Sequence, residues 1–152
     1  MTFDEYLVEL ADPSVKLRIS GLVRLSQMTA EQVQVFLPAW PTLDVRRRRR
    51  VIRELVDLGE DNVEVNFDAV FQAGLEDGDA GVRLEAVGGL WEYEKPDLIG
   101  VLLKILEGDE DAAVRAEAAL ALGRFALLAE YGKLRQRHFQ EVESGLRRVL
   151  ED

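Results

Sequence analysis

A string of the form Asp-x-Asp-x-x-Val-Arg occurs twice in this chain and constrains its fold more than any other feature. Residues 77–83 read Asp-Gly-Asp-Ala-Gly-Val-Arg, and residues 109–115 read Asp-Glu-Asp-Ala-Ala-Val-Arg. Degenerate copies at 12–18 and 42–48 keep one of the acids and the arginine. A repeat period in the thirties is typical of arrays of helical hairpins. The aligned arginines are 30, 35 and 32 residues apart, and they are Arg18, Arg48, Arg83 and Arg115.

Helix signals surround each copy of the motif. Each copy places Asp or Ser ahead of apolar residues at helical spacing, which predicts the start of a second helix. The segment before each motif is amphipathic as well, and Thr29 with Gln32 has the spacing of a capping box. No strand-like alternation is present. We predict an all-α, right-handed α-solenoid in a single domain over 1–152, with helix pairs at 3–10 and 14–27, 30–39 and 44–58, 63–76 and 80–93, 96–107 and 111–130, and a terminal helix at 135–150. The repeats then span about 3–27, 30–58, 63–93 and 96–130.

The repeated motif resembles the HEAT repeat family, in particular the variety also found in phycobilisome-lyase-like proteins. In that variety a turn aspartate is coupled to a Val-Arg near the start of the second helix. The resemblance spans nearly the whole chain and is strongest over 75–128. Because such arrays serve as scaffolds, adaptors, transport receptors and occasionally enzymes, it leaves the function open. It also implies a structural polar ladder between repeats, formed by Asp12, Arg18, Asp44, Arg48, Asp79, Arg83, Asp111 and Arg115.

The composition limits the chemistry that the array can carry. The chain has no cysteine and one histidine, His138, which excludes thiol chemistry, cysteine-bound metals and histidine clusters. Neither a nucleophile elbow nor a phosphate loop is present, and the acidic strings lack the length of a calcium-binding loop. The paired His-Glu motifs of HEAT-like diiron hydroxylases are absent too. We expect no catalysis, no cofactor and no metal.

The charge and hydropathy of the chain indicate where it works. It has 29 acidic against 19 basic side chains, a net charge of −10, which argues against nucleic-acid binding. No apolar run approaches the roughly 20 residues that span a bilayer, and Asp4 and Glu5 stand where a signal peptide carries bases. We expect a cytoplasmic protein without membrane contact. The fifteen arginines against four lysines suggest a GC-rich, bacterial genome.

Apolar residues on the second helices predict a partner-binding face. Positions two, six and nine residues after the motif valine lie opposite the buried stripe of the helix. In this chain those positions are unusually apolar, and two interpretations stay open: packing between neighbouring helices, or a groove for a protein or acidic peptide partner. Under the second interpretation, the partner-binding residues are Arg49, Arg53, Val56, Leu84, Trp91 and Leu120.

Six arginines within residues 46–53 concentrate positive charge in the second copy. They are the run Arg46–Arg50 and Arg53. On one helix face such like charges repel one another, so acids must neutralise them. One solution is ion pairing with neighbouring repeats, for which Glu85 and Glu117 are candidates. The other is capture of an acidic peptide, a phosphate or an RNA backbone.

The last residues leave three alternatives for the role of the chain. Leu150-Glu-Asp repeats residues 75–77, where a turn leads into the next helix. Either a terminal helix caps the array, or the chain is the first part of a longer solenoid. The apolar stripe of Leu146, Val149 and Leu150 packs on the fourth hairpin or supports self-association through the terminal helix. By family analogy, a lyase- or chaperone-like accessory role remains a further alternative.

Overall fold

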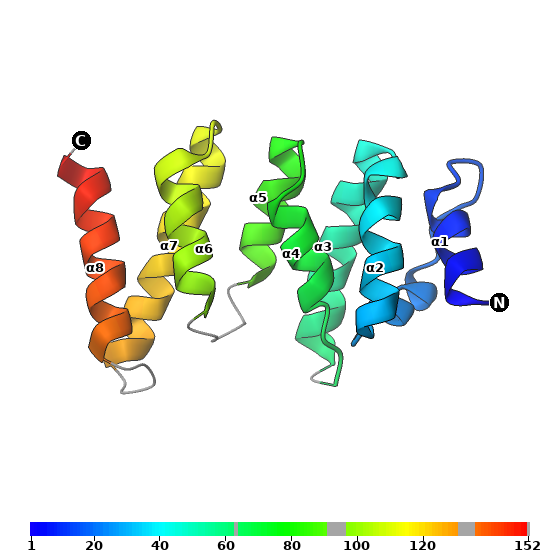
Figure 1. The fold of residues 1–152 in the computed structure, drawn as a ribbon, viewed down its shortest axis with the longest axis horizontal. Helices are drawn as coiled ribbons and strands as arrows, with labels where there is room; N and C mark the ends of the chain where they lie inside the picture. Colours follow the sequence, from blue (N-terminus) through cyan, green and yellow to red (C-terminus); the bar gives the residue numbers. More distant parts are fainter. Residues whose placement is uncertain (63, 91–96, 131–135, 152) are drawn as a thin grey trace. The chain divides into compact units, whose positions relative to one another are not determined.

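The computed structural model describes residues 1–62, 64–90, 97–130 and 136–151. Within these residues every regular element is a helix and no strand is present, which confirms the predicted all-α class (Figure 1). The chain forms two compact units, Met1–Gly89 (unit 1) and Leu90–Asp152 (unit 2). One continuous right-handed array over 1–152 stays a prediction. In the described part of the chain, no helix is both long and apolar enough to cross a bilayer.

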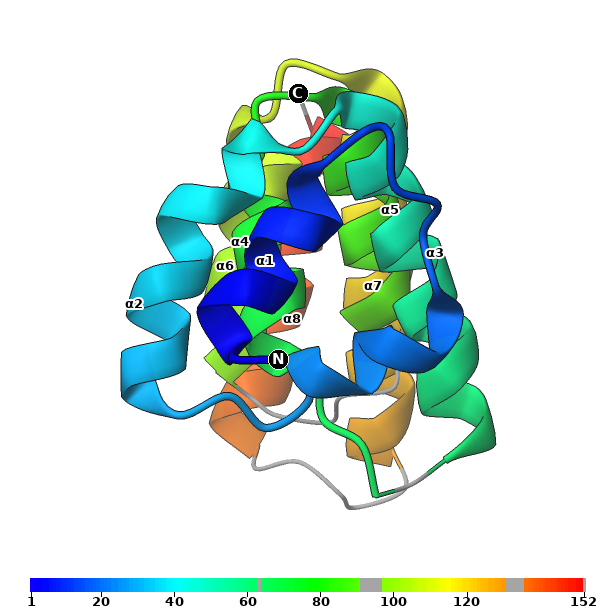
Figure 2. The same cartoon turned by 90° about the vertical axis from the view of Figure 1, so that its right-hand side faces the viewer.

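Unit 1 consists of helices that pack as successive hairpins. In its two later hairpins, α2 (Ala30–Ala39) and α4 (Asp68–Leu75) lie on one side, and α3 (Val45–Asp61) and α5 (Ala80–Gly89) lie on the other (Figure 2). Contacts join α4 with α5, α3 with α5, and α1 with α2. The elements are α1 (Phe3–Ala11), the 3₁₀ helix η1 (Ile19–Leu25), α2 (Ala30–Ala39), the 3₁₀ helix η2 (Trp40–Thr42), α3 (Val45–Asp61), α4 (Asp68–Leu75) and α5 (Ala80–Gly89).

The start of α2 follows the rule read from its sequence. Thr29 Oγ1 accepts a hydrogen bond from the Gln32 amide at 3.1 Å, and Gln32 Oε1 accepts one from the Thr29 amide at 3.0 Å. These reciprocal bonds satisfy two amides that the first helical turn leaves without partners. The predicted capping box is therefore confirmed.

The helix predicted at 14–27 is wrong. Residues 13–15 form a turn and bend, 16–18 have no regular structure, and only Ile19–Leu25 is helical, as η1. Asp12 Oδ1 accepts from the Ser14 amide at 2.9 Å, which closes a local turn that competes with a helix. The carbonyl oxygens of Asp12 and Val15 accept from the Arg47 guanidinium at 2.7 and 2.5 Å, so these carbonyls are engaged from outside the segment.

The predicted helix at 63–76 also begins too early, because α4 starts at Asp68. Asn66 Oδ1 accepts from the Asp68 amide at 2.9 Å and holds a turn before the helix. The Asn66 backbone is also tied to the end of η1, through Ser26 Oγ at 2.8 Å and the Gln27 amide at 2.8 Å. The asparagine thus joins two hairpins where the sequence suggested one continuous helix.

Tyr6 brings a polar group into the interior of unit 1. Its side chain is buried, its Oη has no hydrogen-bond partner, and the Arg24 guanidinium carbon lies 5.5 Å from the ring centroid. Burial raises the pKa of Tyr6 from 10.0 to about 12. The pKa of Tyr6 is higher in the folded than in the unfolded chain, so the neutral ring stabilises the folded state. This contribution to the free energy of unfolding is complete below pH 10. That contribution is lost as the pH rises from 10 towards 12.

We expect Tyr6→Phe to raise the free energy of unfolding at pH 7, or leave it unchanged, because it removes a buried hydroxyl without a partner. The gain is at most about 1 kcal/mol. The variant also loses less stability than the parent between pH 10 and 12, since phenylalanine cannot ionise. Urea unfolding at pH 7, 10 and 11.5 measures both effects. If both proteins lost the same free energy of unfolding between pH 10 and 11.5, Tyr6 would be ruled out as the source of the loss.

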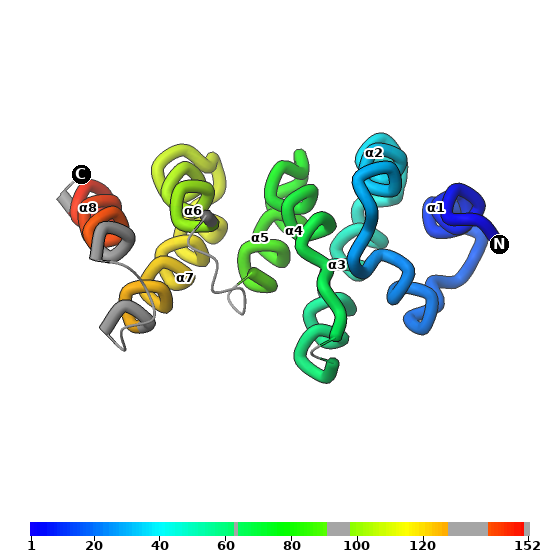
Figure 3. The backbone as a smooth tube through the Cα atoms, turned by 60° about the horizontal axis from the view of Figure 1, so that its bottom comes forward, coloured from blue at the N-terminus to red at the C-terminus, as the bar shows by residue number. Residues whose placement is uncertain are grey.

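The described residues of unit 2 form three helices that contact one another in pairs (Figure 3). The helices are α6 (Asp97–Gly108), α7 (Ala112–Glu130) and α8 (Gln136–Glu151), close to the predicted bounds. The apolar stripe predicted for α7 is confirmed, because each member is at most 3% exposed: Val114, Ala118, Leu122 and Phe125.

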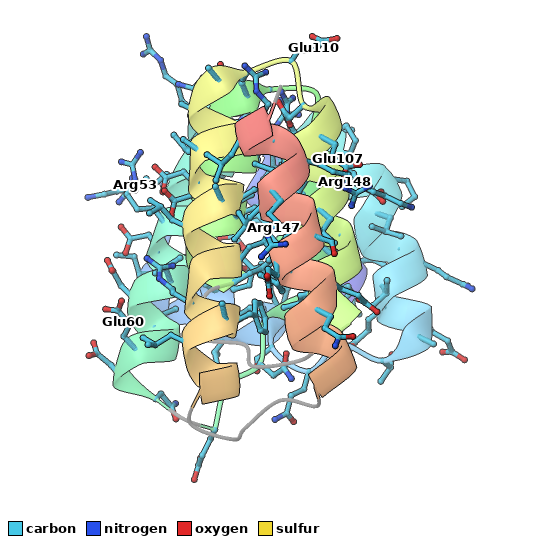
Figure 4. The ribbon with its side chains drawn as sticks, turned by 90° about the vertical axis from the view of Figure 1, so that its left-hand side faces the viewer. Arg53, Glu60, Glu107, Glu110, Arg147 and Arg148 are labelled. Carbon is cyan, nitrogen blue, oxygen red and sulfur yellow. The ribbon has the colours of Figure 1, made fainter. Side chains whose placement is uncertain are left out.

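The terminal helix α8 packs back onto its own unit. Val142 is fully buried, and a Cβ at Gly145 would overlap Leu103 of α6, so the two helices meet closely. Arg148 pairs with Glu107 of α6 at 3.0 Å, and Figure 4 shows the two side chains together. Self-association through α8 stays a prediction.

Candidate protein-interaction surface

The acids of the third motif copy organise the turn that precedes α5. Asp77 Oδ1 accepts from the Asp79 amide at 2.9 Å, and Asp79 Oδ2 accepts from the Val82 amide at 2.9 Å. Arg83 Nη1 returns to the Asp77 carbonyl at 3.0 Å. The first acid therefore shapes the turn, the second caps the helix, and the arginine ties the helix to the turn.

The fourth copy repeats this geometry in unit 2. Asp109 Oδ1 accepts from the Asp111 amide at 2.9 Å, and Asp111 Oδ1 accepts from the Val114 amide at 3.1 Å. Arg115 Nη1 donates to the Asp109 carbonyl at 2.6 Å. In both full copies, then, these hydrogen bonds of the motif lie within one hairpin. The resemblance implied a ladder between repeats, whereas these bonds act within a repeat.

In unit 1, arginines of the 46–53 cluster form ion pairs that link neighbouring repeats. The Arg49 guanidinium donates twice to Asp79, at 2.9 Å each, and Arg53 donates to Glu85 Oε1 at 3.2 and 3.1 Å. A Cβ at Gly81 would overlap the Arg49 guanidinium, so this glycine leaves the space in which the ion pair with Asp79 forms. The hydrogen bond from Arg49 lowers the pKa of Asp79. Two residues predicted to bind a partner thus hold neighbouring helices together.

Two further arginines of the cluster point into unit 1. Arg47 donates to the carbonyls of Leu10, Asp12 and Val15, which lie at the end of α1 and in the turn after it. Arg48 Nη1 donates to the Pro41 carbonyl at 3.2 Å. These contacts satisfy backbone acceptors at the ends of α1 and η2.

The remaining two arginines of the cluster are exposed. Arg50 Nε lies 3.9 Å from Glu54 Oε1, and Arg46 is exposed near it. A cavity of about 220 Å³ borders both side chains together with Ala11 and Pro13. Anion capture by the cluster stays a prediction, and the structure leaves Arg46 and Arg50 as its best placed residues.

The early ladder members form other contacts. Arg18 pairs with Glu9 of α1, and Asp12 closes its own turn with Ser14. Asp44 is the residue before α3 but makes no side-chain hydrogen bond to the helix. The degenerate copies therefore differ in contacts as well as in sequence.

A buried acid between two repeats was missed by the sequence analysis, which treated Asp77 as a turn residue. Asp77 is 8% exposed, and its Oδ2 accepts from Trp40 Nε1 at 2.9 Å. Arg48 Nε lies 3.4 Å from the same oxygen. A groove of about 770 Å³ borders this cluster, with Leu37 and Pro41 on its walls. The available signal was the indole N–H of Trp40, which needs an acceptor when buried.

The positions predicted to line a partner-binding face have different environments. In unit 1, Val56 and Leu84 are half-buried. Leu120 of unit 2 is 59% exposed. Trp91 lies outside the described residues. Partner binding by these residues stays a prediction, and Leu120 is the apolar member that the structure leaves most accessible.

Leu120 belongs to a continuous exposed stripe along α7, which we call the α7 stripe. Its members follow one another at spacings of three and four residues, and all are exposed. Leu127 is 51% exposed, and a Cβ at Gly123 would meet nothing within 4 Å. Spacings of three and four are typical of a seam that packs against another helix. The α7 stripe consists of Ala113, Ala116, Leu120, Gly123 and Leu127.

Comparison with known proteins places the chain in a family. A sequence model of HEAT repeats matches residues 67–151, more than half of the chain. The chain belongs to the HEAT repeat family. No curated protein matches it. The HEAT match includes both full motif copies, and the phycobilisome-lyase-like variety stays a prediction.

HEAT repeats generally mediate protein–protein interaction, so the exposed helix faces of this chain are the candidate sites. In the HEAT hairpin of unit 2, α7 is the second helix, and the α7 stripe lies opposite its buried stripe. In the part of the chain that the structure describes, no group of three or more acidic or histidine side chains is placed to hold a metal ion.

Proposed function

We propose that the chain is a non-catalytic, cytoplasmic protein-interaction scaffold or adaptor that binds its partner through the exposed side of its second helices. The family supports an interaction role, and the α7 stripe carries the proposal. In unit 2, Leu120 and Leu127 are more than half exposed on a helix whose opposite side is buried. A helix that is apolar on both sides is stable in water when a partner covers its second side.

The spacing of the stripe favours an α-helix as the bound element. A helix presents side chains to a neighbour at alternating spacings of three and four residues. Ala113, Ala116 and Gly123 carry small or no side chains, so a partner backbone can approach closely there. The larger side chains of Leu120 and Leu127 project from the stripe and can pack between side chains of the partner helix. We therefore expect the partner to offer an amphipathic helix.

Unit 1 contributes less to this proposal than the sequence suggested. A partner acid that engages Arg49 or Arg53 has to compete with Asp79 or Glu85, which already pair with them. Arg46 and Arg50 are exposed and are better placed for an acidic partner. Exposed ion pairs of this kind contribute at most about 1 kcal/mol each. Apolar burial on α7 is the larger source of affinity.

Leu120→Lys is expected to weaken partner binding at least tenfold, about 1.4 kcal/mol, without unfolding unit 2. The reason is that a lysine ammonium would be desolvated at the centre of the apolar seam, whereas in the free protein it stays in water. Parallel affinity purification with parent and variant baits identifies the partner, and calorimetry measures its affinity.

Leu37→Lys is the matched control, because Leu37 of α2 is also an exposed leucine, at 48%, but lies in unit 1. The control bait should capture the same partner as the parent. Equal capture by the Leu120→Lys bait, with an unchanged circular dichroism spectrum, would refute the proposed surface.

A further inference from the structure

The α7 stripe is complementary in size to itself when it is reversed. Its large members are Leu120 and Leu127, and its small members are Ala116 and Gly123. We infer that the stripe binds the α7 stripe of a second copy of this chain in an antiparallel orientation. The inference rests on the proposed function and names the partner helix.

One antiparallel register satisfies both pairs of contacts. If Leu120 faces Gly123 of the second copy, a step of two turns along each helix brings Leu127 opposite Ala116 of the second copy. Each leucine then fills the space beside a small residue. The open space above Gly123, where a Cβ would meet nothing within 4 Å, is the hole that this register requires.

A parallel pairing lacks this fit. It places Leu120 against Leu120 and Gly123 against Gly123, so a crowded layer alternates with an empty one. Overpacked layers and voids both cost free energy in helix interfaces. The order of large and small residues along α7 therefore selects the antiparallel orientation.

The charges beside the stripe agree with the same register. Glu117 and Arg124 flank it on one side, and both are half-buried. In the antiparallel register Glu117 lies next to Arg124 of the second copy, so the two flanking contacts join opposite charges. Arg124 also has a contact within its own chain, and the new contact adds to it. The other flank is uncharged and consists of Ala112, Ala119 and Ala126.

The expected dimer is weak because the interface is short. The stripe spans 14 residue steps, from Ala113 to Leu127, which is about 21 Å of helix. A single helix pair of this length falls at the low end of specific interface sizes. We therefore expect a dimer that dissociates on dilution, and sedimentation equilibrium of the full chain from about 1 to 500 µM covers this range.

Gly123→Leu separates this inference from a general effect on folding. The leucine improves helix propensity and has room in the free protein, but it fills the hole for Leu120 of the second copy. We expect the dimer to weaken at least tenfold. Gly100→Leu on α6 is the matched control, because a Cβ at this exposed glycine also meets nothing within 4 Å. The control should dimerise like the parent.

Disulfide trapping tests the orientation, since the chain has no native cysteine. Under mild oxidation, Ala116→Cys and Leu127→Cys proteins should form a covalent dimer when mixed and little when alone. Only the antiparallel register brings these two positions within the roughly 7 Å between Cα atoms that a disulfide allows. Efficient linking of each variant with itself would overturn the antiparallel orientation.

The remaining outcomes separate this inference from the proposed function. A parent protein that stays monomeric up to 500 µM, or a Gly123→Leu dimer as strong as the parent, overturns self-association through the α7 stripe. If the parent bait then captures a different protein and the Leu120→Lys bait does not, the α7 stripe is still an interaction surface, and its partner is another protein. If that bait loses nothing, the proposed function falls as well.

Discussion

Replacing Asp77 with alanine is expected to lower the free energy of unfolding by about 2–4 kcal/mol. The Asp77 side chain is only 3% exposed and meets three groups from two repeats. Its Oδ2 accepts from Trp40 Nε1 and lies beside Arg48 Nε, while its Oδ1 accepts from the Asp79 amide. Alanine leaves a buried indole N–H and a largely buried guanidinium without this acceptor. The loss of these partners, rather than of packing volume, causes most of the effect.

Urea unfolding of the full chain at pH 7 measures this loss, and two companion variants locate its source. Asp77→Asn keeps an oxygen acceptor but loses the charge beside Arg48, so an intermediate loss is expected. Trp40→Phe keeps a buried ring but removes the indole donor, and its effect should not add fully to that of Asp77→Ala. A loss below about 1 kcal/mol for Asp77→Ala would show that water replaces its contacts and that the acid does not join the repeats.

Gly74→Ala is the second large effect, with an expected loss of about 1–3 kcal/mol. A Cβ at Gly74 would lie 2.9 Å from Ala86 Cβ and 3.2 Å from Ile52 Cδ1. Ala86 Cβ cannot rotate away, because it is attached directly to the backbone of α5. The added methyl group therefore forces α4 and α5 apart, although alanine itself favours the helix by about 1 kcal/mol over glycine.

Gly59→Ala in α3 is the matched control for this change. A Cβ at Gly59 would meet nothing within 4 Å, so only the gain in helix propensity remains. The control is expected to raise the free energy of unfolding by about 0.5–1 kcal/mol. The two substitutions are chemically identical and should have opposite signs in the same urea titration. If Gly74→Ala also stabilised the protein, the close approach of α4 and α5 would be disproved.

The helical hairpins could be predicted because the repeated motif contains its own local determinants. Asp79 and Asp111 cap their helices through amides only three residues away, so the sequence alone places those helix starts. The buried stripe of α7 follows from helical spacing in the same way. Local signals failed where distant groups decide the conformation. Arg47 engages the carbonyl of Val15, in the segment expected to be a helix at 14–27, and that of Asp12 just before it.

The candidate surface could be predicted only in part. Helical phase was enough to place Leu120 on the exposed side of its helix, as observed. The same phase placed Arg49 and Arg53 on that side, but the acids that pair with them lie 30 and 32 residues away. The sequence analysis named Glu85 as a candidate partner of the cluster, and Glu85 pairs with Arg53, but sequence spacing did not show that Asp79 pairs with Arg49. The surface that we propose for binding is therefore smaller and more apolar than the pattern suggested.

Photo-cross-linking from position 120 tests the central claim most directly, namely that the α7 stripe is an interaction surface for a helix. A benzophenone amino acid is placed at position 120, and at position 37 as the exposed control, in the full chain. The account predicts intermolecular adducts from position 120 that map to a helix, in a second copy near Gly123 or in a partner protein, and few from position 37. Adducts of equal yield from both positions, or none from position 120, would contradict it.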